Sequence, residues 1–361
     1  MKKMRIILKK NMKSLMLTFI ALICALLVAS VIMVLAGYNP LQAYQSIVTG
    51  AFGSRNAIAQ TFLKATPLMI IGLAIAVAFK GSAFNIGAEG QFYAGALGAA
   101  LSEMYFHETA LPSFIIIFLC LVTAFVFGGI WGAIPGYLRS ARGASEVVTS
   151  VMLTSVMLLF VRYLVTQGGP IAEPRGFYPE TQEIVESARL PYIWENTRLH
   201  AGFIIALFVA LAVYLLMEKT TWGYKIKATG LNSLSAEYGG INIGLVTVTT
   251  MALSGAIAGL AGGVEVLGTS WKLYMGLSPG YGYNAIAVAL LGRLNPVGII
   301  FSALLFGMLN TGSNQMARSI GIPSTLAAVL QALVLLFVVG FSVLENKEII
   351  LKKWKRGGNN E

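Results

Sequence analysis

Residues Phe84–Ala100 read FNIGAEGQFYAGALGAA, an apolar, glycine-rich run whose first turns hold three polar side chains, Asn85, Glu89 and Gln91. A charged group at membrane depth is costly, so such groups usually face a cavity, a partner or a transport path. Two interpretations are open: the three side chains line a path or gate, or they are polar glue between helices. In either case we expect them at the turn into a membrane span, close to its inner mouth.

The composition of the whole chain indicates that this stretch lies in a membrane protein. Of 361 residues, 57% are hydrophobic and only 11% are charged, and the mean hydropathy is +0.75. Soluble domains carry roughly 25% charged residues. We therefore predict an all-α polytopic membrane protein in contact with the lipid bilayer, with residues 1–361 forming a single membrane domain.

Apolar segments of the length of a membrane helix recur along the chain. They lie at residues 15–37, 56–79, 84–106, 112–138, 147–166, 201–217, 245–267, 283–292, 296–313 and 323–344. This predicts about ten transmembrane helices, of which 283–292 is too short to cross alone and is broken or re-entrant. Each half holds one glycine-interrupted segment, Phe84–Gly90 and Gly276–Asn284, a pairing that points to a substrate path between inverted repeats. Spans two to five and seven to ten would then form the repeat.

Two ladders of glycines at four-residue spacing, one on 112–138 and one on 245–267, favour close helix packing. Their members are Gly128, Gly132 and Gly136, and Gly255, Gly259 and Gly263.

The distribution of positive charge predicts the orientation. With a cytoplasmic N-terminus, 18 lysines and arginines fall inside and six outside, which places both termini in the cytoplasm. The net charge of +11 then reflects orientation and not nucleic-acid binding. The basic arm 1–14 and tail 345–361 are cytoplasmic, and 167–200 form an ordered outer cap. Residues 218–244 form a cytoplasmic loop with a short helical stretch suited to a groove on a partner.

Enzyme motifs are weak in this chain. Gly276–Gly280 reads GLSPG and matches the G-x-S-x-G of serine hydrolases, but Pro279 has no N–H for an oxyanion hole. There is no aspartate, both histidines fall in outer loops, and neither a phosphate loop nor a metal-binding spacing occurs. We expect a transport protein that binds no cofactor of its own. An ion-coupled secondary transporter is the alternative class; it would need a membrane-centred carboxylate, whereas the glutamates here are expected near span ends.

Four motifs in fixed order resemble permease subunits of bacterial ABC importers for branched-chain amino acids, simple sugars and nucleosides. They are ATPLMIIGLAIAVAFKGSAFNIGAEGQ, ASEVVTSVML, ATGLNSLSAEYGGIN and YNAIAVALLGRLNPVG. FNIGAEGQ is similar to the nucleoside (guanosine-type) and simple-sugar branch. The resemblance implies a multi-pass permease of the bacterial plasma membrane that forms the path for nucleosides, with a simple sugar as the alternative substrate. It implies a second permease (a related, different chain), ABC ATPase subunits that use ATP and Mg²⁺, and an extracellular substrate-binding lipoprotein.

The resemblance also suggests roles for particular residues. Ala144–Thr149 matches the segment that closes the inner gate, although Ser145 stands where the motif has asparagine. Gly230–Ile241 corresponds to the element that contacts the ATPase, with Ala236 small enough to enter a groove and Gly239 or Gly240 ending the helix in a left-handed conformation. The predicted path and gate residues are Asn85, Glu89, Gln91, Ser145, Glu146, Thr149 and Asn284. The predicted coupling residues are Gly230, Asn232, Ala236, Glu237, Gly239 and Ile241.

Overall fold

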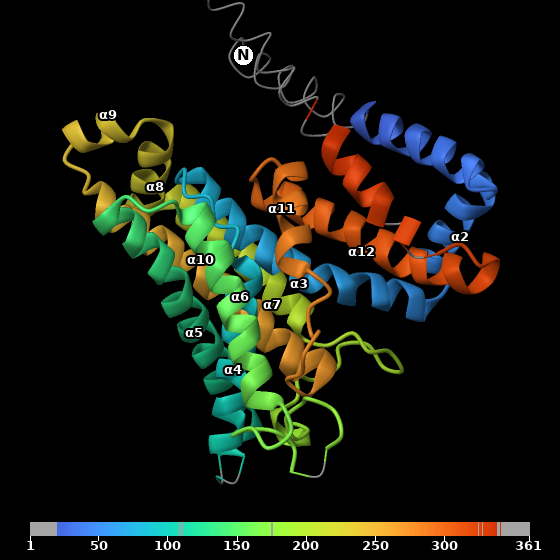
Figure 1. Ribbon diagram of the computed structural model, residues 1–361, viewed down its shortest axis with the longest axis horizontal. Helices are drawn as coiled ribbons and strands as arrows, with labels where there is room; N and C mark the ends of the chain where they lie inside the picture. Colours follow the sequence, from blue (N-terminus) through green and yellow to red (C-terminus); the bar gives the residue numbers. More distant parts are fainter. Residues whose placement is uncertain are drawn as a thin grey trace, which may run out of the picture. The chain divides into compact units, whose positions relative to one another are not determined.

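The computed structural model describes residues 20–340 apart from Glu108, Ala110, Arg175, Ser324, Ala327, Val338 and Val339. Within these residues the regular structure is helical (Figure 1). Extended pairing among them is limited to two isolated bridges, Glu180 with Tyr274 and Tyr192 with His200. The all-α prediction is confirmed. The predicted basic arm 1–14 and tail 345–361 lie outside the described residues.

The chain divides into two compact units, Met1–Ser54 with Met308–Glu361, and Arg55–Gly307. In the first unit, helix Ile20–Leu35 is followed, after a bend of 119°, by α2 (Pro40–Phe52). Pro40 stands at the start of α2, where its missing N–H costs nothing. The sequence analysis missed α2, because its mixed polar and apolar residues do not resemble a membrane span. The single membrane domain stays a prediction.

The second unit is a bundle of helices with its long connections at opposite ends. Its elements are α3 (Arg55–Lys80), α4 (Ala88–Phe106), α5 (Ser113–Arg142), α6 (Glu146–Val165), α7 (Gly202–Lys219), α8 (Thr221–Leu231), α9 (Ser233–Tyr238), α10 (Ile243–Glu265) and α11 (Tyr281–Leu291). A π-turn, Val266–Ser270, extends α10, and α12 (Pro296–Ile320) follows α11. Figure 1 shows α8 and α9 at one end of this bundle and the cap 167–200 at the other.

Six of the described helices are long and apolar enough to cross a membrane, or up to seven if the bent pair counts as one span. The prediction of about ten spans is therefore not confirmed, since α4 is not among the six and helix Ala328–Phe337 is short. The prediction that 283–292 is too short to cross alone is confirmed, because α11 has 11 residues. The inverted repeat and the cytoplasmic termini stay predictions.

Helix α10 packs against α3, α4 and α5, and its contact with α5 depends on glycine. A Cβ atom at Gly132 would lie 2.8 Å from the Cα of Gly255, and one at Gly128 would lie 2.6 Å from the Cα of Gly259. Real side chains do not approach so closely, so the two backbones touch directly. The packing role predicted for the glycine ladders is confirmed.

Candidate translocation and coupling site

Asn85 and Gln91 form a closed pair of side-chain amides at the start of α4. Asn85 Nδ2 donates to Gln91 Oε1 at 2.7 Å and to Ser254 Oγ at 2.8 Å, and Gln91 Nε2 donates to Asn85 Oδ1 at 3.0 Å. Ser254 Oγ in turn donates to the carbonyl of Ala74 at 2.7 Å. All three polar side chains are buried. A buried network with its partners in place rigidifies the elements it joins, here α3, α4 and α10.

The amide pair lies deeper than the sequence suggests. Ala74 is six residues before the end of α3 at Lys80, a depth of about 9 Å at 1.5 Å per residue. Ser254 is the middle residue of α10. The loop 81–87 thus turns back along α3 and α10, and the position of Asn85, Glu89 and Gln91 close to the inner mouth stays a prediction. For Asn85 and Gln91 the geometry favours the interpretation as polar glue.

Glu89 joins the two glycine-interrupted segments. Its Oε2 accepts a hydrogen bond of 2.6 Å from the N–H of Gly282 in the first turn of α11, and the Ser278 side chain is a further hydrogen-bond partner. Glu89 is only 4% exposed. A Cβ atom at Gly282 would lie 2.6 Å from Glu89 Cα, so only glycine allows this approach. The two glycine-interrupted segments that the sequence analysis pairs are therefore in direct contact.

The helix bounds agree with the expectation that the glutamates lie near span ends, because Glu89 stands in the first turn of α4, Glu146 begins α6 and Glu265 ends α10. Glu89 follows by four residues Asn85, whose side chain contacts the middle of α10. Its carboxylate faces the first turn of α11, where free backbone N–H groups favour negative charge. The carboxylate therefore holds the start of a short helix in place.

Ser278 and Tyr93 complete the start of α11. Ser278 Oγ accepts hydrogen bonds from the N–H groups of Gly280 (3.2 Å) and Tyr281 (2.8 Å), so it acts as a helix cap. The Tyr93 hydroxyl accepts from Ser278 N–H at 3.0 Å. Asn284, predicted on the path, is partly exposed on α11, and its N–H donates to the carbonyl of Gly280. The sequence analysis missed Tyr93, whereas the spacing of Ser278 before α11 is a readable capping signal.

The predicted gate turn is fastened by an ion pair. Arg139 Nη1 lies 2.6 Å from Glu146 Oε1 and also donates to the carbonyl of Ser82 at 2.9 Å. Glu146 Oε1 accepts a longer hydrogen bond of 3.4 Å from Phe84 N–H. Gly143, with φ 66°, ends α5 and lets the chain reverse into α6. The gate turn and the loop 81–87 are thus joined, and Arg139 is the partner that the sequence analysis did not single out.

The other two predicted gate residues lie outside this network. Ser145 is exposed and makes no side-chain capping bond to α6. The Thr149 hydroxyl donates to the carbonyl of Ser145 at 3.0 Å within its own helix. Helix α6 instead packs on α4 through Gly87, where a Cβ atom would lie 2.8 Å from Ser150 Cβ.

The same loop 81–87 is attached to the predicted coupling region. Ser82 Oγ donates to the carbonyl of Gly230, near the end of α8, at 2.8 Å. A Cβ atom at Gly230 would collide with the carbonyl oxygen of Lys80, so the two backbones require glycine there. One short loop therefore contacts α8, the gate turn and the amide pair.

Capping residues at both ends shape α9, the core of the predicted coupling element. Asn232 Oδ1 accepts from Ser235 N–H at 3.0 Å. At the other end Gly240 has the left-handed φ of 80°, while Gly239 does not, and Ile241 N–H donates to the carbonyl of Ala236 at 3.1 Å. The prediction of a short helix with a left-handed end is confirmed at Gly240.

The side chains of α9 divide into an inner and an outer set. Ala236 is 6% exposed, so it packs against its own chain, and the expectation that it enters a partner's groove is not supported by its position. Glu237 and Gly239 are exposed, as are the large apolar side chains of Leu234 (67%) and Tyr238 (94%). The sequence analysis did not single out these two.

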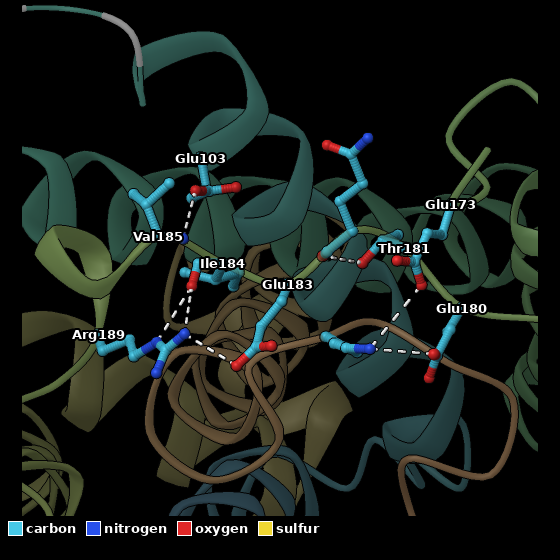
Figure 2. Close-up of polar contacts among 10 residues, drawn as sticks. Glu103, Glu173, Glu180, Thr181, Glu183, Ile184, Val185 and Arg189 are labelled. Carbon is cyan, nitrogen blue, oxygen red and sulfur yellow. Dashed lines mark hydrogen bonds and ion pairs between the residues drawn. The ribbon is translucent and has the colours of Figure 1, made fainter. Parts of the chain in front are cut away.

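The cap at the opposite end is bound to the segment that leads from α10 into α11. Lys272 Nζ lies 3.0 Å from Glu180 Oε1 and 3.9 Å from Glu173 Oε2 (Figure 2). The hydrogen bond that Lys272 donates to Glu180 raises the pKa of Lys272. Thr181 N–H donates to the carbonyl of Leu273 at 2.9 Å, and Leu273 N–H donates back to Thr181 Oγ1 at 3.0 Å. Residues of the predicted cap are thus held to this segment, and the outer location of the cap stays a prediction.

Arg189 ties the cap to the same segment through an aromatic ring. Its guanidinium lies 4.3 Å from the ring centre of Trp271 and donates to Glu183 Oε1 at 2.9 Å and to the carbonyl of Ile184 at 3.1 Å (Figure 2). Cation–π contacts of this kind favour arginine. The cap therefore holds the residues that precede the contact of Glu89 with α11.

His200 joins the start of α7 to the π-turn of α10. Its Nδ1 accepts from Gly202 N–H at 3.1 Å, and its Nε2 lies 3.1 Å from Thr269 Oγ1. Because Nδ1 is an acceptor, the neutral ring carries its proton on Nε2. The ring is 1% exposed, and burial lowers the pKa of His200 to about 4.

Comparison with known proteins places these features in a family. Residues 57–339 match the model of the branched-chain amino acid transport system permease component. The guanosine ABC transporter permease protein NupP of Bacillus subtilis is 33% identical over 97% of this chain and 99% of its own length. The nucleoside ABC transporter permease protein NupB of Lactococcus lactis is 33% identical over 92% of this chain and 93% of its own. The glucose ABC transporter permease protein TsgB13 of Haloferax volcanii is 30% identical over 94% and 91%. The chain belongs to the branched-chain amino acid transport system permease family of ABC transporters.

Proposed function

We propose that this chain is the permease subunit of an ATP-driven importer that carries nucleosides across the bacterial plasma membrane. The observation that carries the proposal is the 33% identity, over almost the full length of both chains, to a guanosine permease. The geometry of this chain supports the proposal, because Glu89 and Gly282 join its two glycine-interrupted segments, and interrupted helices form the substrate sites of many transporters.

The proposal includes partners on both sides of the membrane. ABC ATPase subunits, which use ATP and Mg²⁺, bind the exposed face of α9 on the cytoplasmic side, where the termini also lie. A second permease, a related but different chain, forms the other half of the path. A substrate-binding lipoprotein delivers the nucleoside at the cap. Support for the ATPase contact comes from Leu234 and Tyr238, whose apolar side chains are exposed as an interface anchor would be.

Two other functions are weaker. A simple sugar is the alternative substrate, favoured by the 30% identity to a glucose permease. An ion-coupled secondary transporter would need a membrane-centred carboxylate, whereas Glu89 stands in the first turn of α4. The Glu89 carboxylate is also engaged with the first turn of α11 at 2.6 Å, and membership of an ABC permease family argues against coupling to ions.

Uptake of radiolabelled guanosine tests the substrate. Cells that express the complete importer are compared with cells that lack only this chain, and unlabelled adenosine, glucose and leucine are added as competitors. We expect guanosine uptake to require the chain and to be inhibited by adenosine alone. Inhibition by glucose, or uptake that is independent of the chain, would refute a nucleoside permease.

Co-purification tests the coupling face. Leu234→Ser should reduce the amount of ATPase that purifies with the permease, because it removes an exposed apolar anchor. Phe177→Ser is the matched control, since Phe177 is 95% exposed but lies in the cap at the opposite end of the bundle. An equal loss of ATPase in both variants would contradict a specific role for α9.

A further inference from the structure

The second half of α12 carries a stripe of polar side chains. Thr311, Asn314, Gln315 and Arg318 occupy positions i, i+3, i+4 and i+7, so they share one face of the helix. Asn314, Gln315 and Arg318 are exposed. The Thr311 hydroxyl is buried and has no hydrogen-bond partner among the residues that the structure describes. We call these four residues the polar stripe.

Helix α2 adds polar groups beside the stripe. Gln42, Gln45, Ser46 and Thr49 repeat the same spacing on α2, and the first, second and fourth are exposed. Ser319 Oγ donates to Ser46 Oγ at 3.4 Å. The helices pack closely here, because a Cβ atom at Gly50 would lie 2.9 Å from Gln315 Cγ. All of these residues belong to the first compact unit.

Lipid is an unsuitable neighbour for the polar stripe. Helix α12 is one of the six that are long and apolar enough to cross a membrane. Its first half exposes apolar side chains, Val297 at 55% and Phe301 at 67%. Asn314 and Gln315 lie six and five residues before the end of α12 at Ile320, about 8–9 Å along the helix axis, and exposed amides within a membrane helix face water, a cavity or a partner.

The two carboxamides of the stripe match a polar solute. Each carboxamide of Asn314 and Gln315 offers donors and an acceptor together, the combination that pairs with the edge of a nucleobase. The Thr311 hydroxyl is buried, so the exposed groups that meet a solute are those of Asn314, Gln315 and Arg318. A solute with amide-like edges would pair with both carboxamides.

We propose that the polar stripe lines a water-filled part of the translocation path and that Asn314 and Gln315 hydrogen-bond the passing solute. The identity of that solute as a nucleoside depends on the proposed function. The exposure of the stripe to water does not depend on it.

Cysteine reactivity tests the first half of this proposal. In a background with Cys24→Ala and Cys120→Ala, single cysteines replace Asn314 and Gln315, and Val297 and Phe301 serve as matched exposed controls on the same helix. The complete transporter in lipid nanodiscs, with both faces open, reacts with a charged methanethiosulfonate reagent. Because the reactive species is the thiolate, which needs water, we expect the stripe positions to react at least about tenfold faster than the controls. Equal rates at all four positions would overturn the proposal.

Protection by solutes tests the second half. Guanosine in the presence of ATP and the binding lipoprotein should slow labelling of Asn314→Cys and Gln315→Cys, while leucine should not. Fast labelling that guanosine, adenosine and glucose all fail to slow would overturn solute contact. Labelling that appears only after the two permeases are separated would assign the stripe to the permease interface and overturn the proposal. Protection by glucose and not by guanosine would leave the stripe on the path while refuting the nucleoside function.

Transport kinetics provide an independent readout. Asn314→Ala should raise the KM for uptake about 3- to 10-fold, the range expected for loss of one or two hydrogen bonds, with little change in maximal rate. Phe301→Ala on the same helix should leave the KM unchanged. A fall in maximal rate with an unchanged KM in Asn314→Ala would contradict solute binding.

Discussion

Acidification is expected to destabilise this protein through His200. The ring is buried, Nδ1 accepts a hydrogen bond from Gly202, and burial lowers its pKa from 6.5 to about 4. Because the folded pKa lies below the unfolded one, the unfolded state binds the proton first as the pH falls. Stability is therefore fully present above pH 6.5, declines between pH 6.5 and 4, and levels off below pH 4. The difference of about 2.5 pKa units amounts to about 3 kcal/mol, of which about 2 kcal/mol is lost by pH 5.

Denaturant titration in detergent measures this loss. The free energy of unfolding is determined between pH 7.5 and pH 5 for the parent protein and for His200→Gln. The glutamine does not titrate, so its free energy should fall by about 2 kcal/mol less over this range, even though the variant starts from a lower value. His107→Gln is the matched control, because His107 is the second of the two histidines and is exposed.

Comparing the parent protein with His200→Gln separates the effect of protonating His200 from the effect of protonating carboxyl groups. Carboxyl groups also bind protons over this range, but they do so equally in both proteins. If His200→Gln loses as much stability as the parent protein between pH 7.5 and pH 5, the ring is not held neutral, and the reasoning from its burial fails.

Three further predictions concern the loop 81–87 and the residues around it. Glu146→Ala should lower uptake with insertion intact. In a double-mutant cycle, the variant in which Arg139 and Glu146 are exchanged should regain about 1 kcal/mol of the free energy of unfolding that the single variants lose; no regain would mean that the ion pair is incidental. Gly230→Ala should destabilise the protein by about 1–3 kcal/mol because its Cβ meets backbone, whereas Gly239→Ala should change the free energy of unfolding by less than about 0.5 kcal/mol; equal effects would contradict the close contact. Glu89→Ala should abolish uptake by leaving the N–H of Gly282 unpaired, while Glu89→Gln, which keeps an acceptor, should retain most of it; an inactive glutamine variant would show that the charge itself is required.

The pairing of the two interrupted segments could be predicted from the sequence, because glycines within apolar runs mark both of them. A contact between the two segments could be expected, but the groups that form it, the Glu89 carboxylate and the Gly282 N–H, could not be predicted. The capping of α9 by Asn232 and Gly240 was also readable, since caps depend on neighbouring residues.

The depth of the amide pair could not be predicted. Asn85 and Ser254 are 169 positions apart, and nothing local says that the loop 81–87 turns back into the bundle. Likewise, the inward position of Ala236 depends on packing against the rest of the chain. The count of spans is not confirmed, because hydropathy measures composition, whereas helix length depends on where the backbone bends, as it does before α2.

The glycine contact between α5 and α10 has a consequence for biosynthesis. Helix α5 ends at Arg142, and α10 begins at Ile243. At about 5–20 residues per second, the ribosome needs roughly 5–20 s to make the intervening chain. During this interval the face of α5 that carries Gly128 and Gly132 lacks its partner helix α10. Lipid chains pack poorly against the backbone that these glycines leave exposed. We expect the insertion machinery to retain α5 until α10 arrives, so that these two helices leave it as a pair.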